Sequence, residues 1–153
     1  MTAYQLAQLN LGLFRAPLDG PEMAEFTAAL APINAIAEAT PGFVWRLTSD
    51  DGESSSFVDV PGREDPLWAP NLSVWTDLDS LKHFMYQSGH ASYLRRRSEW
   101  FQNPNRPINV LYWIRAGEIP SLGDAVERLD YLTDNGPSDY GWPLTRPFPP
   151  PDQ

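Results

Sequence analysis

Residues 108–115, INVLYWIR, predict a strand that is apolar on both faces. Side chains alternate along a strand, so the even-numbered residues share one face and the odd-numbered residues share the other. The even-numbered face is wholly apolar: Ile108, Val110, Tyr112 and Ile114. The other face carries Leu111 and Trp113. A sheet with helices on one side can leave its second side polar, and this strand indicates that both sides are covered.

Further strands and helices are predicted on either side of this segment. Alternating apolar residues predict strands at residues 4–11, 43–48 and 71–76. Helices are expected from about Pro21 to Pro41, after a cap at Thr76 or Asp77, from His90 to about Phe101, and from Ser121 to Asn135. Pro32 interrupts the first helix and should kink it or split it in two. Within residues 43–48, strict alternation places Phe43, Trp45 and Leu47 on one face, opposite Val44.

The order β-α-β-β-α-β, followed by one more helix, is typical of an α+β fold, the ferredoxin-like split βαβ pattern. The sheet should be antiparallel, with its two crossover helices on one face. We expect residues 1–136 to form this domain. Residues 137–153 should form an extended, Pro-rich aromatic tail that lies on a surface.

A second copy of the chain is the simplest cover for the other sheet face, in a closed two-fold homodimer. The alternative is that the aromatic tail folds over the open face of its own sheet.

Composition excludes several classes of protein. The chain has 20 acidic and 11 basic residues, a net charge of −9, which disfavours nucleic acid and anionic membranes as partners. It has no cysteine, so disulfides and iron–sulfur sites are excluded. The opening MTAYQLAQLN does not resemble a signal peptide, and no apolar run approaches 18 residues. We therefore expect a cytoplasmic protein.

Residues 86–101 hold the candidate catalytic residues, His90 and Arg97. At 100° per residue one helical face would carry Tyr86, His90, Tyr93, Leu94, Arg97 and Phe101. Two turns, roughly 10.5 Å, would separate His90 from Arg97. In a pocket, Arg97 could bind an anionic or carbonyl oxygen, and His90 could transfer a proton or bind a metal. Alternatively, His90 caps the segment, and a partly desolvated Arg97 pairs with a carboxylate or a loop carbonyl.

Other polar and aromatic residues are candidates for binding a substrate. Asn10 lies on the same strand face as Gln8, and Asn34 lies in the inward stripe of the first helix. Such amides either satisfy backbone groups or line a cavity. The aromatic candidates are Trp45, Trp75, Tyr86, Tyr93 and Trp113. Tryptophans at such positions more often belong to a core or a dimer interface than to a pocket.

Sequence motifs for well-known chemistries are absent. The chain contains no GxGxxG, no P-loop and no G-x-S-x-G elbow. It has two histidines, seven residues apart, and no H-E-x-x-H, so no metal site is predicted.

One further pattern extends over most of the chain. Its central residues are Trp75, Leu78, Leu81, Phe84, Tyr86, Ser88, His90, Arg97, Trp100, Phe101 and Leu111-Tyr112-Trp113. Residues 4–10, 41–47 and 132–149 add to it. With this pattern the chain resembles the uncharacterised bacterial family DUF3291. The resemblance implies a dimeric α/β barrel, a superfamily that includes cofactor-independent antibiotic-biosynthesis monooxygenases and haem-binding or haem-degrading proteins. It implies no particular reaction.

Three functions remain open at this point. The first is a protein or monooxygenase-like enzyme that binds a small, largely aromatic molecule without a bound cofactor. The second is a haem protein with His90 as the axial ligand. The third is a non-catalytic binding or structural dimer.

Overall fold

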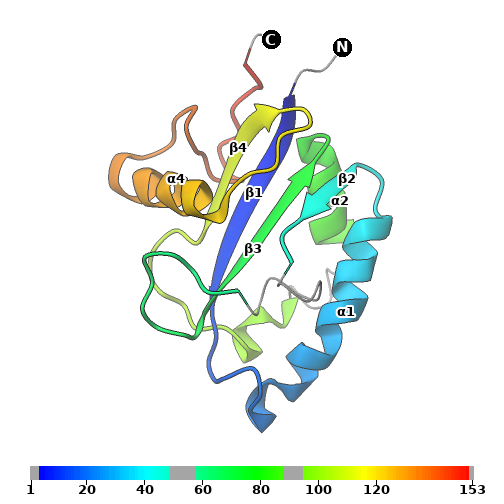
Figure 1. Cartoon of the computed structure of the whole chain (residues 1–153), viewed down its shortest axis with the longest axis vertical. Helices are drawn as coiled ribbons and strands as arrows, with labels where there is room; N and C mark the ends of the chain where they lie inside the picture. Colours follow the sequence, from blue (N-terminus) through cyan, green and yellow to red (C-terminus); the bar gives the residue numbers. More distant parts are fainter. Residues whose placement is uncertain (1–3, 49–57, 88–94, 152–153) are drawn as a thin grey trace.

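The computed structural model describes residues 4–48, 58–87 and 95–151 and has one mixed α+β fold (Figure 1). The strands are β1 (Tyr4–Leu13), β2 (Phe43–Arg46), β3 (Trp68–Trp75) and β4 (Asn109–Arg115). The α-helices are α1 (Ala24–Ala39), α2 (Leu78–Gln87) and α4 (Leu122–Asn135), and short 3₁₀ helices are η1 (Pro21–Met23) and η3 (Arg97–Glu99). The strands form one sheet in the order β2-β3-β1-β4, and all three pairings are antiparallel. This is the ferredoxin-like arrangement predicted from the sequence.

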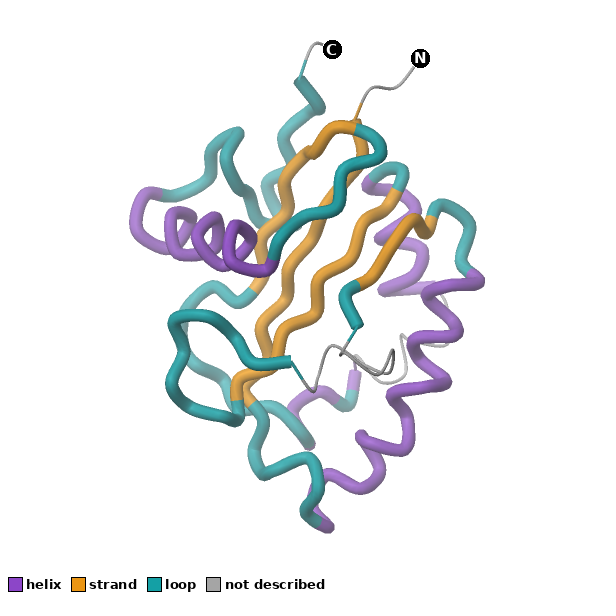
Figure 2. Tube along the Cα trace, viewed as in Figure 1, coloured by secondary structure: helices purple, strands orange, loops and turns teal. Residues whose placement is uncertain are grey.

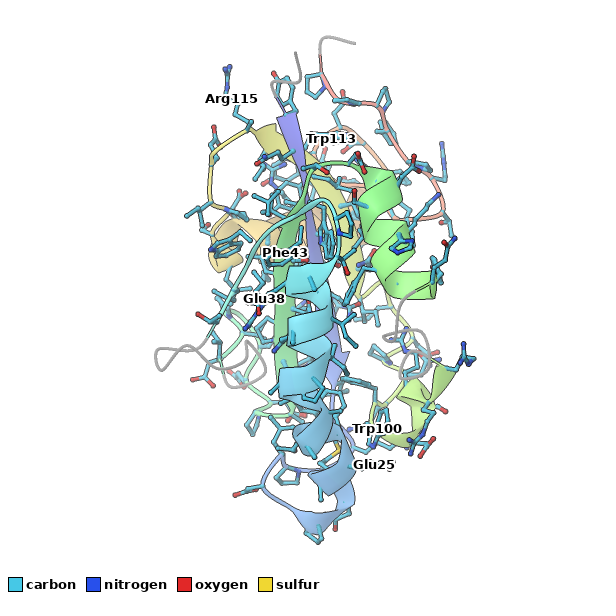
Figure 3. The ribbon with its side chains drawn as sticks, turned by 90° about the vertical axis from the view of Figure 1, so that its right-hand side faces the viewer. Glu25, Glu38, Phe43, Trp100, Trp113 and Arg115 are labelled. Atoms are coloured by element: carbon cyan, nitrogen blue, oxygen red, sulfur yellow. The ribbon has the colours of Figure 1, made fainter. Side chains whose placement is uncertain are left out.

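Helices lie on both faces of the sheet. On one face α1 and α2 supply Ala37 and Leu81 to a core with Trp75 and Leu111. Figure 3 shows both helices in front of the sheet. On the other face the buried residues of α4, among them Leu129, contact Tyr112 of β4, and α4 runs beside β4 in Figure 2.

Helix α4 therefore covers the sheet face for which a second copy or the tail was expected. The even-numbered residues of β4 are at most 8% exposed within a single chain. Val60, in the segment before β3, adds to the same core. At β4 the apolar face is buried without a partner, so this strand is no longer a reason to expect a homodimer, which stays a prediction.

The C-terminal tail lies on the side of α1 and α2 and continues the sheet beyond β4. Trp142 and Leu111 exchange backbone hydrogen bonds of 2.8 and 2.9 Å. The indole Nε1 of Trp113 donates to the carbonyl oxygen of Phe148 at 2.8 Å. Trp142 is 0% exposed, so the tail adds a fully buried side chain to the core.

Strand β2 corrects one prediction about side-chain direction. Phe43 pairs with Trp75, but Trp45 pairs with Val74, so two steps on β2 match one step on β3. This is a β-bulge, in which Val44 is the extra residue. Phe43 consequently lies against Trp75 on the face of α1 and α2, whereas Trp45 lies on the face of α4.

The helix ends agree with their predicted caps. A carboxylate oxygen of Asp77 accepts from the backbone N–H of Ser80 at 2.8 Å, and the hydroxyl of Ser121 accepts from Asp124 at 3.1 Å. Helix α1 runs unbroken through Pro32, contrary to the predicted split. Pro32 and Ala28, whose carbonyl loses its helical partner, are both exposed, so water can satisfy that carbonyl.

Candidate functional site

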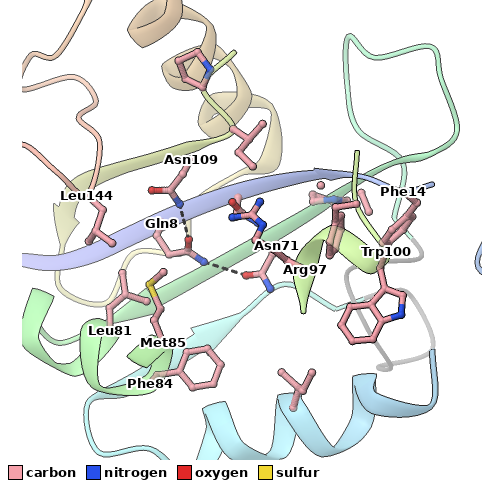
Figure 4. A pocket seen from close by; sticks show the side chains of 18 of the residues that line it. Gln8, Phe14, Asn71, Leu81, Phe84, Met85, Arg97, Trp100, Asn109 and Leu144 are labelled. Carbon is pink, nitrogen blue, oxygen red and sulfur yellow. Dashed lines mark hydrogen bonds between the residues drawn. The ribbon is translucent and has the colours of Figure 1, made fainter. Parts of the chain in front are cut away.

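A pocket of about 660 Å³ lies between the sheet and helices α1 and α2 (Figure 4). It is large enough for a small organic molecule. Three strands, two helices, the 95–109 segment and the tail all contribute to it. The lining residues used below are Gln8, Asn10, Gly12, Phe14, Phe26, Leu30, Asn34, Asn71, Leu81, Met85, Tyr86, Arg97, Trp100, Phe101, Arg106, Asn109 and Leu144.

Apolar side chains form the walls. Leu30 comes from α1, Leu81 and Met85 come from α2, and Leu144 comes from the tail. Figure 4 shows Leu81, Met85 and Leu144 grouped at the same end of the pocket. These side chains favour the apolar part of a ligand by removing it from water.

Aromatic rings close the opposite end. The ring centroids of Phe14 and Phe101 are 5.2 Å apart, those of Phe14 and Phe26 are 5.4 Å apart, and Phe26 lies 5.6 Å from Trp100. Spacings of this size are favourable for aromatic pairs. A Cβ atom at Gly12 would overlap the ring of Phe101, so glycine is needed where this ring lies against β1.

A row of asparagines crosses the floor of the pocket. Asn10 on β1 pairs in register with Asn71 on β3 and with Asn109 on β4. All three residues line the pocket. Each belongs to a different strand, and the antiparallel register brings the three together on one face.

Gln8 is the neighbour of Asn10 on the same face of β1, and it links the row of asparagines to the core. Its Nε2 donates to Oδ1 of Asn71 at 3.0 Å and to the hydroxyl of Ser73 at 2.9 Å, and its Oε1 accepts from Asn109 at 3.2 Å. The hydroxyl of Ser73 also accepts from the indole of Trp75 at 2.9 Å. Gln8 is only 8% exposed, so these bonds satisfy a buried amide and fix the floor in place.

Two amides of the pocket have no protein partner in the described part of the chain. Asn10 and Asn34 are partly buried. Neither side chain hydrogen-bonds to residues 4–48, 58–87 or 95–151. Each offers two N–H donors and a carbonyl acceptor to the pocket.

Arg97 and Arg106 are the charged residues of the described lining. Arg97 lies in η3, a 3₁₀ turn rather than the predicted α-helix. Figure 4 shows its side chain beside Asn71. Arg97 is exposed as a residue, and the partial desolvation of its guanidinium stays a prediction. Arg106, also exposed, lies 3.5 Å from a carboxylate oxygen of Asp130.

The structure brings together some of the candidate residues from the sequence. Asn10, Asn34, Tyr86 and Arg97 all line the pocket. His90 and Tyr93 lie outside the described residues. Their roles, like the catalytic role of Arg97, stay predictions.

The three candidate tryptophans lie elsewhere. Trp75 is 1% exposed and packs against Phe84 with ring centroids 5.3 Å apart. Trp113 faces the tail, where its indole is hydrogen-bonded to Phe148. Trp45 lies on the opposite face of the sheet. None of the three lines the pocket as it is described.

Sequence analysis missed several lining residues, including Asn71, Asn109 and Trp100. One signal was present: Asn71 and Asn109 are amide residues within or beside the predicted strands 71–76 and 108–115. Only the strand register shows that they meet Asn10.

No metal-binding cluster is found among the described residues. They contain no group of three or more histidine, aspartate or glutamate side chains placed to hold a metal ion. His83 is exposed on α2, within hydrogen-bonding distance of Gln87 (3.2 Å), and does not line the pocket. His90, the proposed haem ligand, lies outside the described residues. Separately, none of the helices in the described ranges is long and apolar enough to cross a membrane.

Comparison with solved structures gives weak similarities. A mutant form of SnoaB, a cofactor-independent oxygenase from Streptomyces nogalater, aligns at 17% identity over 75% of this chain and 95% of its own, with a TM-score of 0.47. The SnoaB structure determined to 1.9 resolution aligns at 18% identity over 77% and 97%, with a TM-score of 0.44. A protein of unknown function from Nitrosomonas europaea aligns at 14% identity over 78% and 97%, also with a TM-score of 0.44.

Comparison with curated proteins and family models gives one assignment. No curated protein matches the chain. A family model, the domain of unknown function DUF3291, matches residues 5–153. This range includes the sheet, the helices, the pocket and the tail, so the chain belongs to the DUF3291 family.

Proposed function

We propose that the protein binds a small, largely aromatic organic molecule in the pocket between the sheet and helices α1 and α2. The observation that carries the proposal is the combination of apolar and aromatic walls with lining amides, two of which, Asn10 on the floor and Asn34 on α1, have no protein partner among the described residues. A ligand ring would contact Leu30, Met85 and Phe101. Its carbonyl or hydroxyl groups would bond to Asn10 and Asn34.

The proposal concerns binding of a ligand rather than catalysis. The described lining contains amides, two arginines, a tyrosine and a threonine, but no histidine or carboxylate that could act as a general base. For a monooxygenase-like activity, one of the functions left open by the sequence, the bound molecule would need an acidic proton of its own. The amides would then stabilise the resulting anion through hydrogen bonds.

The neutral aromatic dye Nile red tests the proposal. Its fluorescence should rise and shift to shorter wavelength when it enters the pocket, and the signal should saturate at one dye per chain. Leu30→Trp should abolish the signal, because the larger ring fills the pocket beside the asparagine row.

Ile119→Trp is the matched control, since Ile119 is 67% exposed and outside the pocket. Equal dye binding by parent, Leu30→Trp and Ile119→Trp, with all three folded by circular dichroism, would contradict the proposal.

A homodimer is the second part of the proposal, and the resemblance to the dimeric α/β barrels supports it. Trp45, Leu47 and Trp68 are only partly buried on the face of α4. They lie on or next to β2 and β3, at the side of the sheet away from β4. This is the part of the face where a second copy would bind.

A further inference from the structure

We infer that the molecule bound in this pocket is an anion, an aromatic acid whose carboxylate, or a group of similar charge, pairs with Arg97 and Arg106. The inference rests on the proposed function and adds the charge of the ligand.

The first observation is the charge of the lining itself. The chain has nine more acidic than basic residues, yet both charged residues of the described lining are arginines. They come from segments on either side of Phe101, one in η3 and the other just before β4. An apolar pocket with cations and no carboxylate favours a negatively charged ligand over a neutral or positive one.

The second observation is that Arg97 is not engaged by protein. Its neighbour Arg96 is held by Glu25 and Glu99, each at 2.7 Å, and its guanidinium lies 4.8 Å from the Trp100 ring centroid. Arg97 makes no side-chain hydrogen bond or ion pair with residues 4–48, 58–87 or 95–151. Its donors are therefore free to form the bidentate pair that guanidinium makes with carboxylate.

Arg106 is only weakly engaged. Its nearest carboxylate, Asp130, is 3.5 Å away and is already paired with Arg63 at 2.9 Å. Most of the donors of Arg106 remain unused. The carboxylates of Glu25 and Glu99 are thus paired with Arg96, and that of Asp130 is shared between Arg63 and Arg106.

The third observation concerns the polar groups between the cations and the apolar walls. The amides of Asn10 and Asn34 can donate to a carboxylate or to an ionised phenol or enol. A ligand with one acidic end and a ring system would place its charge at Arg97 and its rings against Leu81 and Met85.

Two probes of nearly equal shape, 1-naphthoate and 1-naphthamide, test the inference by isothermal titration at low salt. The parent should bind 1-naphthoate about tenfold or more tightly than the neutral amide, the difference expected for a charged hydrogen bond. Added salt should weaken binding of 1-naphthoate and leave 1-naphthamide unchanged.

Variants of single arginines test which residue pairs with the negative charge of 1-naphthoate. Arg97→Gln should weaken 1-naphthoate binding about tenfold and change 1-naphthamide binding by less than about twofold. Arg106→Gln should act in the same direction. Arg95→Gln is the matched control, because it removes the same charge from an exposed arginine of the same segment that does not line the pocket. It should leave both affinities unchanged.

Equal affinity for the two probes, or an equal loss from Arg95→Gln and Arg97→Gln, would overturn the inference. Binding of neither probe would also overturn it. In each case, saturable Nile red binding that Leu30→Trp abolishes would leave the proposed function standing. If Nile red also fails to bind, the proposed function falls as well.

Discussion

Leu111 and Trp142 form a two-hydrogen-bond backbone pair that attaches the C-terminal tail to the edge strand β4. Two residues further on, Leu144 reaches the pocket. The ring centroids of Trp113 and Phe148 lie 6.3 and 6.5 Å from that of Trp142. The tail is therefore part of both the core and the pocket.

Trp142→Ala should lower the free energy of unfolding by about 3–5 kcal/mol, as expected when a large buried aromatic side chain is removed. Urea denaturation measures this change. Ile119→Ala, at an exposed site, should change it by less than about 0.5 kcal/mol. A loss below about 1 kcal/mol for Trp142→Ala would mean that the tail contributes little to the core.

Gln8 and Asn10, on the same face of β1, should respond differently to replacement by leucine. Gln8→Leu removes an amide that is bonded to Asn71, Ser73 and Asn109. It leaves buried groups without partners and should cost about 1–3 kcal/mol of stability.

Asn10→Leu removes no side-chain hydrogen bond to the described residues and should change stability by less than about 1 kcal/mol. It should instead weaken the binding of 1-naphthoate, because one donor to the ligand is lost. Thermal melts measure the stability of Gln8→Leu and Asn10→Leu, and titrations measure their binding of 1-naphthoate. A larger loss of stability for Asn10→Leu than for Gln8→Leu would contradict the hydrogen-bond network described here.

Tyr112 carries a buried hydroxyl that has no hydrogen-bond partner among the described residues. Its ring lies 4.3 Å from the guanidinium carbon of Arg128. Tyr112→Phe keeps this ring contact and removes the unsatisfied hydroxyl, so stability at neutral pH should be unchanged or raised by up to about 1 kcal/mol.

Burial raises the pKa of Tyr112 above its ordinary value of 10, and the opposing effect of the Arg128 charge is smaller. The folded protein keeps the phenol proton at a pH where the unfolded chain loses it, so the stability contribution is present below pH 10 and is lost as pH rises above it. The parent should lose stability between about pH 9 and about pH 11 more steeply than Tyr112→Phe. Urea denaturation midpoints of both proteins at about pH 9 and about pH 11 measure this loss of stability. Equal losses for the parent and Tyr112→Phe would refute the raised pKa.

The homodimer predicts a sedimentation mass of about twice 17.2 kDa at micromolar concentration. Trp45→Arg would place a charge on the partly buried patch near β2 and should shift the protein toward the monomer. Ile119→Arg, at an exposed position in a loop, should not shift the protein toward the monomer. A parent protein that sediments as a monomer contradicts the dimer.

The fold could be predicted largely from local signals. Alternation of apolar residues identified all four strands, and side-chain caps at Asp77 and Ser121 marked the starts of α2 and α4. The bulge at Val44 could not be predicted, because period-two alternation assumes an uninterrupted strand. The role of α4 was also missed, since its apolar residues fit either face of the sheet.

The site was only partly predictable, for a related reason. Asn10 and Asn34 were identified from polar residues at inward positions of single elements. The row that Asn10 forms with Asn71 and Asn109 depends on the register of three strands, which the sequence of a single strand does not predict. Arg97 was assigned to the pocket on the assumption of a continuous helix, whereas it reaches the pocket from a 3₁₀ turn.

The side-chain amide groups of the asparagines give the most direct test of the pocket. In a ¹⁵N–¹H correlation spectrum, assigned with Asn→Asp variants, titration with 1-naphthoate should shift the NH₂ signals of Asn10, Asn34, Asn71 and Asn109, all in the pocket. The signals of Asn103 and Asn135, which lie outside it, should stay unchanged. Saturating shifts confined to the first group are the predicted result. Shifts that are absent from that group, or that occur equally at Asn103 and Asn135, would contradict the claim that this pocket binds the ligand.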